Sequence, residues 1–215
     1  MAHYIRNTIL SIAILFIIST LGLWLYFSFN PVIKESPGMT FLLKAGTSSG
    51  KVIDEFTQGG IVSHPPLVSL WIYLRGDAKH LKVGEYYFPK GASFLTIWTQ
   101  MVKGTGRIYH PLTIIPGWTF SQVRELTRET QGLVHSTKNL TDVEIMQRLG
   151  HPGLSPEGEF FPETYFYTYG VSDISMYKQA FDLMQTKLAA AWNKRAPDLP
   201  YQSFQQVLTI VLALD

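Results

Sequence analysis

One segment of the sequence gathers the residues best suited to acid–base chemistry. Residues 151–165 read H-P-G-L-S-P-E-G-E-F-F-P-E-T-Y and place the carboxylates of Glu157, Glu159 and Glu163 among aromatic side chains. A carboxylate among Phe and Tyr rings loses hydration, so its pKa rises and it can stay protonated near neutral pH as a general acid. Aromatic faces beside acids also suit a sugar ring, whose C–H face stacks while its hydroxyls bond to acceptors.

The same segment has a purely structural interpretation. In that interpretation four aromatic residues fill a corner of the core: Phe160, Phe161, Tyr165 and Tyr167. The carboxylates of Glu157 and Glu163 would then accept hydrogen bonds from loop amides. From the residues alone, both interpretations stay open.

The sequence lacks the motifs of thiol, metal, phosphate-binding and serine-nucleophile sites. The chain has no Cys, which excludes a thiol nucleophile, a thiolate metal site and a disulfide framework, and its six His residues form no H-E-x-x-H pattern. Residues 44–51 look like a phosphate-binding loop, but Ala45 stands where that motif needs Gly and Val52 where it needs a hydroxyl. No G-x-S-x-G nucleophile motif is present. We therefore expect no metal and no cofactor.

Composition narrows the class of protein further. The 215 residues carry a formal net charge of only +2, which argues against a basic nucleic-acid binder. With 46% hydrophobic and 13% aromatic residues, the chain is too apolar to be disordered. A folded protein without a nucleic-acid partner is the expectation.

The N-terminal segment predicts a membrane anchor. Residues 8–29 are almost wholly apolar, and as a helix they would span about 33 Å, enough for a bilayer. A cleaved signal peptide is the alternative, but residues 23–27 are bulky and offer no small-residue cleavage site. Arg6, in the short tail at residues 1–7, favours a cytoplasmic N-terminus with the rest of the chain outside.

A unit of strand, Gly turn and capped helix occurs three times after the anchor. The three copies begin at residues 41–48, 86–93 and 112–119, and in each a hydroxyl residue two positions after Gly can cap the helix. Between the first two copies we predict a helix that starts near Ser63 and ends at Gly76. Its expected buried residues are Leu67, Leu70, Trp71 and Leu74.

Two more helices are predicted beyond residue 130, followed by a terminal apolar segment. Thr141 and Glu144 form a capping-box pattern before a short helix whose inward residues would be Val143, Met146 and Leu149. A longer helix ends before Pro197 and turns one face inward through Tyr177, Phe181, Met184, Leu188 and Trp192. Residues 204–214 read as another helix or buried segment. The fold class is therefore α+β.

The order of motifs resembles the YceG-like family, the endolytic murein transglycosylases also called MltG. The matching motifs are F-L-L-K-A-G-T-S-S-G at 41–50, G-G-I-V-S at 59–63, L-K-V-G-E-Y-Y-F at 81–88, I-I-P-G-W-T at 114–119, P-E-G-E-F-F-P-E-T-Y at 156–165 and L-P-Y at 199–201. They follow an N-terminal anchor and cover nearly the whole chain. The resemblance implies a LysM-like peptidoglycan-binding region at 39–104 and the N-terminal part of a catalytic domain at 105–215.

The resemblance also implies a reaction and a location. Such enzymes cleave the β-1,4 bond between N-acetylmuramic acid and N-acetylglucosamine in nascent glycan strands without water, leaving 1,6-anhydromuramic ends. The protein would then sit in the inner membrane as a single-pass protein with its C-terminal part in the periplasm. Peptidoglycan strands, the membrane and the cell-wall synthesis machinery are the implied partners.

The catalytic residue of the family is a Glu shortly after the L-P-Y motif. Residues 208–215 match that segment without gaps, and Asp215 falls at the position of the Glu and ends the chain. We assign a supporting role to Glu163 and substrate binding to Glu159, Phe161 and Tyr165. On this alignment the chain would be a truncated, inactive or impaired family member that releases no anhydro-muropeptides. The alternative is an anchored peptidoglycan-binding or scaffold protein without catalysis.

Overall fold

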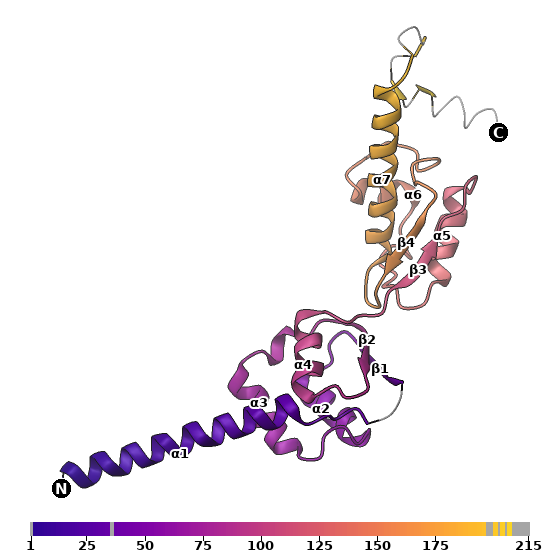
Figure 1. Cartoon of the computed structure of the whole chain (residues 1–215). Coiled ribbons are helices and arrows are strands. Elements are labelled where there is room, and N and C mark those ends of the chain that lie inside the picture. Colours follow the sequence, from indigo (N-terminus) through magenta and orange to yellow (C-terminus); the bar gives the residue numbers. More distant parts are fainter. Residues whose placement is uncertain (1, 35–36, 197–199, 202, 205, 208–215) are drawn as a thin grey trace. The chain divides into compact units, whose positions relative to one another are not determined.

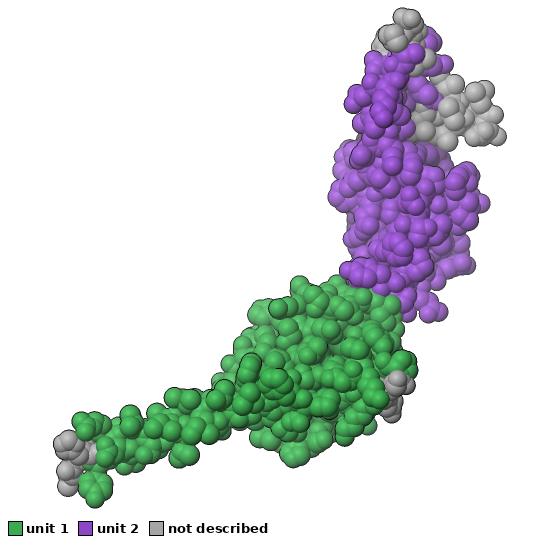
Figure 2. All heavy atoms as spheres, viewed as in Figure 1, with its two compact units in different colours: residues 1–108 green, residues 109–215 purple. Residues whose placement is uncertain are grey.

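The computed structural model describes residues 2–34, 37–196, 200–201, 203–204 and 206–207. They belong to two compact units, residues 1–108 (unit 1) and residues 109–215 (unit 2), shown in Figure 1 and Figure 2. Each unit combines helices with a two-stranded sheet, so the expected mixture of helices and strands is confirmed. The LysM-like character of 39–104 and the incomplete catalytic domain at 105–215 stay predictions.

Helix α1 (Ala2–Phe29) contains the predicted anchor. Its segment Tyr4–Phe29 is long and apolar enough to cross a membrane. Over most of its length the large apolar side chains are exposed, as Phe16 is at 62%. The last turns differ, because Phe27 is 4% exposed and packs into the core of unit 1. A helix that is apolar on all sides and stands free of the protein core is a candidate anchor.

Unit 1 is built on a strand pair covered by short helices. Strands β1 (Gly38–Leu43) and β2 (Gly84–Pro89) pair antiparallel, with Phe41 opposite Tyr86. The helices are α2 (Ser49–Gln58), α3 (Pro65–Arg75), the 3-10 helix η1 (Ala78–His80) and α4 (Phe94–Lys103). The most deeply buried side chains of this core are Val52, Phe56, Tyr86, Phe88, Phe94, Ile97, Trp98 and Met101. The predicted strands and helices of the first two copies are therefore confirmed.

The Gly turns and hydroxyl caps of the three copies have the predicted geometry. Gly46, Gly91 and Gly117 have φ values of 77°, 85° and 82°, which an L side chain rarely adopts. The side chains of Ser48 and Ser93 accept hydrogen bonds from the amides three residues later, both at 3.3 Å. A complete capping box at Thr119 and Gln122 begins the third helix.

The predicted buried face of α3 is confirmed at Trp71 and wrong at its three Leu residues. The buried residues of this helix are Val68, Trp71 and Ile72, whereas Leu67, Leu70 and Leu74 are 42%, 49% and 54% exposed. The helix begins at Pro65, with Pro66 also in its first turn, close to the predicted start near Ser63, and Gly76 ends it as predicted. Almost every position of the helix is apolar, so the sequence holds no polar face from which the orientation can be deduced.

Unit 2 also combines one antiparallel strand pair with helices, of which α7 is the longest. Strands β3 (His110–Thr113) and β4 (Thr164–Tyr167) pair antiparallel, with Leu112 opposite Tyr165. The helices are α5 (Phe120–Glu129), α6 (Asp142–Arg148) and α7 (Asp173–Asn193). The sequence did not predict β4, because four residues of alternating burial become a strand only by pairing with β3. The core consists mainly of Leu112, Phe120, Val123, Ile145, Met146, Phe160, Tyr165, Met176, Tyr177 and Phe181.

Two expectations for the helices of unit 2 need correction. The capping box at Thr141 and Glu144 is confirmed, but Val143 is 67% exposed and Ile145 takes the expected inward place beside Met146. In α7 the N-terminal part of the predicted face is buried, as Tyr177 and Phe181 are. The rest of that face is only half-buried: Met184, Leu188 and Trp192. Most of the segment 204–214 lies outside the described residues.

Candidate functional site

The loop between α6 and β4 is held on the core of unit 2 by its aromatic residues. The ring of Phe160 stacks on Phe120 of α5 with centroids 4.8 Å apart and meets Tyr177 of α7 edge-on at 5.8 Å. The amide of Phe161 donates a hydrogen bond to the carbonyl of Ala180 in α7 at 3.1 Å. The loop is thus fixed against helices α5 and α7, which sets the positions of its three carboxylates.

Glu159 is the buried carboxylate of this loop. The residue is 3% exposed, and its Oε2 accepts a hydrogen bond from Nε2 of Gln185 in α7 at 2.7 Å. Burial raises the pKa of Glu159 above its ordinary value, whereas the hydrogen bond from Gln185 and the nearby His151 act in the opposite direction. The direction of this shift favours the protonated carboxyl, but the burial of Glu159 limits direct contact with a substrate.

Glu157 and Glu163 bond to backbone amides. The Oε2 of Glu157 accepts a hydrogen bond at 2.9 Å from the amide of Phe120, the first residue of α5. A carboxylate at that position satisfies a free amide of the helix start and complements the helix dipole. Glu163 accepts a 3.0 Å bond from the amide of Thr164, at the start of β4. Both contacts are those of the structural interpretation, while the supporting role assigned to Glu163 stays a prediction.

Phe161 and Tyr165 are joined by a hydrogen bond. The hydroxyl of Tyr165 donates a 2.6 Å hydrogen bond to the carbonyl of Phe161, and burial raises the pKa of Tyr165 to about 12. Tyr165 is 7% exposed, whereas Phe161 is half-buried, with Nζ of Lys187 5.5 Å from its ring centroid. Of the three predicted substrate-binding residues, only Phe161 therefore offers substantial surface to a ligand.

Helix α7 contributes two residues that the sequence did not identify as part of this region. Gln185 and Lys187 reach the loop at Glu159 and Phe161. The only signal for Gln185 was its place one turn after Phe181, on the inward face of the helix. Asp215, the predicted catalytic position, lies outside the described residues.

The described part of the chain holds no cluster suited to a metal. Among residues 2–34, 37–196 and the few described thereafter, no group of three or more His, Asp or Glu side chains is close enough to bind one ion.

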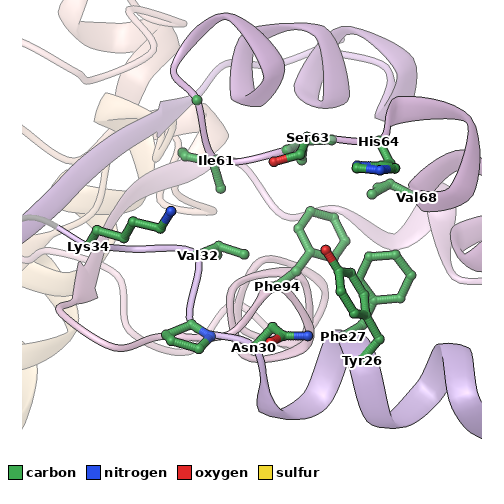
Figure 3. A pocket seen from close by; sticks show the side chains of 13 residues that line it. Tyr26, Phe27, Asn30, Val32, Lys34, Ile61, Ser63, His64, Val68 and Phe94 are labelled. Carbon is green, nitrogen blue, oxygen red and sulfur yellow. The ribbon is translucent and has the colours of Figure 1, made fainter.

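A separate pocket of about 260 Å³ lies in unit 1, where α1 meets the loop before α3. Figure 3 shows Ser63 and His64 on one side of this pocket and Tyr26 and Asn30 on the other. Lys34 also lines it. The pocket mixes apolar walls with hydroxyl, amide and amine groups, and it lies directly beside the end of the candidate anchor.

Comparison with known proteins identifies the family of the chain. The family model for the YceG-like family matches residues 41–211. A crystal structure of a YceG-like protein from Listeria monocytogenes is similar at 16% identity, with a TM-score of 0.34 over 74% of this chain. The match covers 58% of the Listeria chain, so this chain spans less than two thirds of that protein. No curated protein matches the chain. Because the family match extends over most of the chain, the protein belongs to the YceG-like family, known generally as a family of murein transglycosylases.

Proposed function

We propose that the protein is a membrane-anchored endolytic transglycosylase that acts on peptidoglycan strands. The observation that carries the proposal is the family match over residues 41–211, which extends through both units. In this proposal unit 1 contains a LysM-like glycan-binding region at 39–104, and residues 105–215 belong to the catalytic domain. Helix α1 crosses the inner membrane with the tail at residues 1–7 in the cytoplasm, so the part of unit 1 after α1 and the whole of unit 2 lie in the periplasm.

The reaction needs one carboxyl that acts first as acid and then as base. It protonates the glycosidic oxygen between N-acetylmuramic acid and N-acetylglucosamine, so the N-acetylglucosamine-bearing strand leaves as an alcohol. The C6 hydroxyl of the muramyl residue then attacks C1 and returns its proton to the carboxylate. The products are a 1,6-anhydromuramic end and a free hydroxyl end, and no water is consumed. We assign this carboxyl to Asp215.

The loop at 151–165 would form one wall of the glycan cleft. Phe161 is the residue of this loop that we expect to stack on a sugar ring, because its ring is only half-buried and Lys187 lies beside it. Glu159 and Tyr165 are too buried for extensive contact. Their hydrogen bonds to Gln185 and to the Phe161 carbonyl would hold the wall in position.

A second candidate function is glycan binding without catalysis. It is favoured by the identity of residue 215, because Asp is one methylene shorter than the family's Glu and withdraws the carboxyl by about 1 Å. Such a displacement can reduce a reaction rate by on the order of 100-fold. The protein would then bind peptidoglycan at the membrane and act as a scaffold.

Substitution of residue 215 separates the two functions. The full chain and its variants Asp215→Glu and Asp215→Asn are incubated with purified sacculi, and anhydro-muropeptides are measured by mass spectrometry. If residue 215 is the acid, Asp215→Glu releases at least about tenfold more product than the natural chain, and Asp215→Asn releases none. Equal release from all three would place the acid elsewhere. No release from any of them, with full co-sedimentation with sacculi, would favour the binding function.

A further inference from the structure

The outward surface of α3 is apolar, although it faces away from the core of unit 1. Leu67, Leu70, Tyr73 and Leu74 are 42%, 49%, 80% and 54% exposed. Their spacing places them on one side of the helix. A surface helix of a protein in water normally carries polar side chains on that side. We therefore expect an apolar partner to cover this side of α3.

Helix α3 packs against the end of α1. The ring of Phe27 in α1 lies 5.2 Å from that of Trp71 in α3 and 5.6 Å from that of Phe94 in α4, measured between centroids. One turn earlier, Leu23 is half-buried against the same core. Figure 2 shows the earlier part of α1 standing clear of the rest of unit 1. The position of α3 along the axis of α1 is thus set by direct contact.

Bilayer dimensions place this contact at the outer boundary of a membrane. A helix needs about 20 residues to cross the hydrocarbon core, and such a span counted from Thr8 ends at Phe27. Trp24 and Tyr26 are 48% and 49% exposed at this level. Aromatic residues of this kind concentrate where lipid meets water. The part of unit 1 that contacts Phe27 therefore lies at the depth of the lipid head groups, and so does the pocket beside it in Figure 3.

The charges around α3 also suit a phospholipid surface. Residues 56–76 contain no Asp and no Glu. The first carboxylate after them, that of Asp77, is engaged by Arg75 at 2.7 Å and by Nε1 of Trp98 at 2.8 Å. Lys79 and His80 follow and are exposed. Lipid phosphates repel carboxylates and attract cations, so this arrangement of charges favours a bilayer as the occupant.

We propose that α3 docks unit 1 onto the lipid surface beside α1, with its four exposed apolar side chains between head groups and acyl chains. The inference rests on the proposed membrane anchor. Two contacts with the bilayer would fix the orientation of unit 1, whereas a single helix would allow it to swing. A glycan-binding unit fixed in this way stays close to the membrane.

Spin labels at single cysteines test the docking, because the natural chain has no Cys. The full chain is placed in phosphatidylethanolamine–phosphatidylglycerol nanodiscs with a nitroxide at Leu70→Cys in α3, Phe16→Cys in α1 or Asp54→Cys in α2. Relaxation is measured with oxygen, which concentrates in lipid, and with a water-soluble nickel chelate. We expect labels at 70 and 16 to respond several-fold more to oxygen, and the label at exposed Asp54 to respond more to nickel.

Each other outcome refutes a separate part of the argument. An oxygen response at 16 with a nickel response at 70 would overturn the docking and leave the anchor intact. A nickel response at 16 would overturn the anchor and the docking with it. A label at 70 shielded from both reagents would mean that a protein surface, such as a second copy of the chain, covers α3. A label at Leu74→Cys, one turn further along the same face of α3, should show the same preference for oxygen over nickel as the label at Leu70→Cys.

Discussion

Asp173 connects the start of α7 to the loop at residues 133–140, and its replacement tests how unit 2 is held together. The carboxylate is 2% exposed. It accepts bonds from the amide and hydroxyl of Ser136 at 3.0 and 2.6 Å, and from those of Thr137 at 3.1 and 2.6 Å. The amide of Ile174 adds a fifth bond at 2.8 Å. Burial raises the pKa of Asp173, but these bonds together outweigh burial and leave the pKa below its ordinary value.

The variant Asp173→Asn keeps the shape of the side chain and removes its charge. One of its two oxygens becomes an NH₂ group, which faces donors instead of accepting from them. Thr137 is 3% exposed, so water does not replace the lost acceptor for its amide and hydroxyl. The buried Thr137 amide left without an acceptor costs about 1–3 kcal/mol, and the loss of the charged acceptor for the Thr137 hydroxyl adds a similar amount, which gives about 2–6 kcal/mol in total. We expect a loss of about 3 kcal/mol in the free energy of opening of unit 2.

Asp182 of the same helix supplies the matched control. Its carboxylate pairs with Nζ of Lys178 at 3.0 Å, and the two side chains are 57% and 62% exposed. Because exposed ion pairs contribute little, Asp182→Asn should change stability by less than about 1 kcal/mol.

Hydrogen–deuterium exchange of the full chain measures both variants. A loss of about 3 kcal/mol speeds exchange of protected amides in peptides from 133–140 and 174–181 by on the order of 100-fold. Because folding lowers the pKa of Asp173, its ionised carboxylate stabilises the folded state. This stabilisation is complete above the unfolded-state pKa, near 3.8, and is lost as the pH falls through the folded-state pKa. Asp173→Asn should lack this acid-dependent component. Equal exchange in the two variants would refute the argument.

Three further predictions concern unit 2. Because folding raises the pKa of Glu159, the protonated carboxyl stabilises the folded state. This stabilisation is complete below the unfolded-state pKa of 4.5 and is lost as the pH rises through the folded-state pKa. Glu159→Gln, which stays neutral, should therefore lose less Tm than the natural chain between about pH 4 and about pH 8; parallel losses would contradict this. Gly132 and Gly153 both have φ of 84°, but an added Cβ would meet the Tyr169 ring at 2.8 Å only at Gly132. In chemical denaturation Gly132→Ala should lose about 2 kcal/mol more than Gly153→Ala, and similar losses would rule out the clash. Phe161→Ala should weaken co-sedimentation with sacculi by about tenfold, whereas Phe166→Ala, which removes a ring that is 61% exposed, should not; equal effects would deny Phe161 a specific role.

Helix starts were predictable from the sequence because their signals are local. The caps at Ser48, Ser93, Thr119 and Thr141 each depend on a hydroxyl and an amide three residues apart, as their hydrogen bonds show. The positive φ values of the Gly residues before the first three of these caps were likewise a local requirement of the turn. Features of this kind need no knowledge of tertiary contacts.

Features that depend on distant residues were not predictable in the same way. Strand β4 exists through pairing with β3, about 50 residues earlier, as Leu112 opposite Tyr165 illustrates. The contact of Glu159 with Gln185 joins a loop to a helix 26 residues away. For α3, the apolar pattern was recognised, but the tertiary packing of Val68, Trp71 and Ile72 in the core of unit 1 decides which side of the helix is buried.

The three carboxylates of the loop at 151–165 show why contacts must decide between chemical roles. In the sequence Glu157, Glu159 and Glu163 all lie among aromatic residues, and we assigned a supporting role to Glu163 and substrate binding to Glu159. In the structure two of them bond to the first amides of α5 and β4, and Glu159, the one with a raised pKa, is 3% exposed. A general acid must contact the glycosidic oxygen to transfer its proton, and a side chain that is only 3% exposed cannot make this contact. The assignment of the acid–base step to Asp215 stays a proposal, and the comparison of Asp215→Glu with Asp215→Asn is its decisive test.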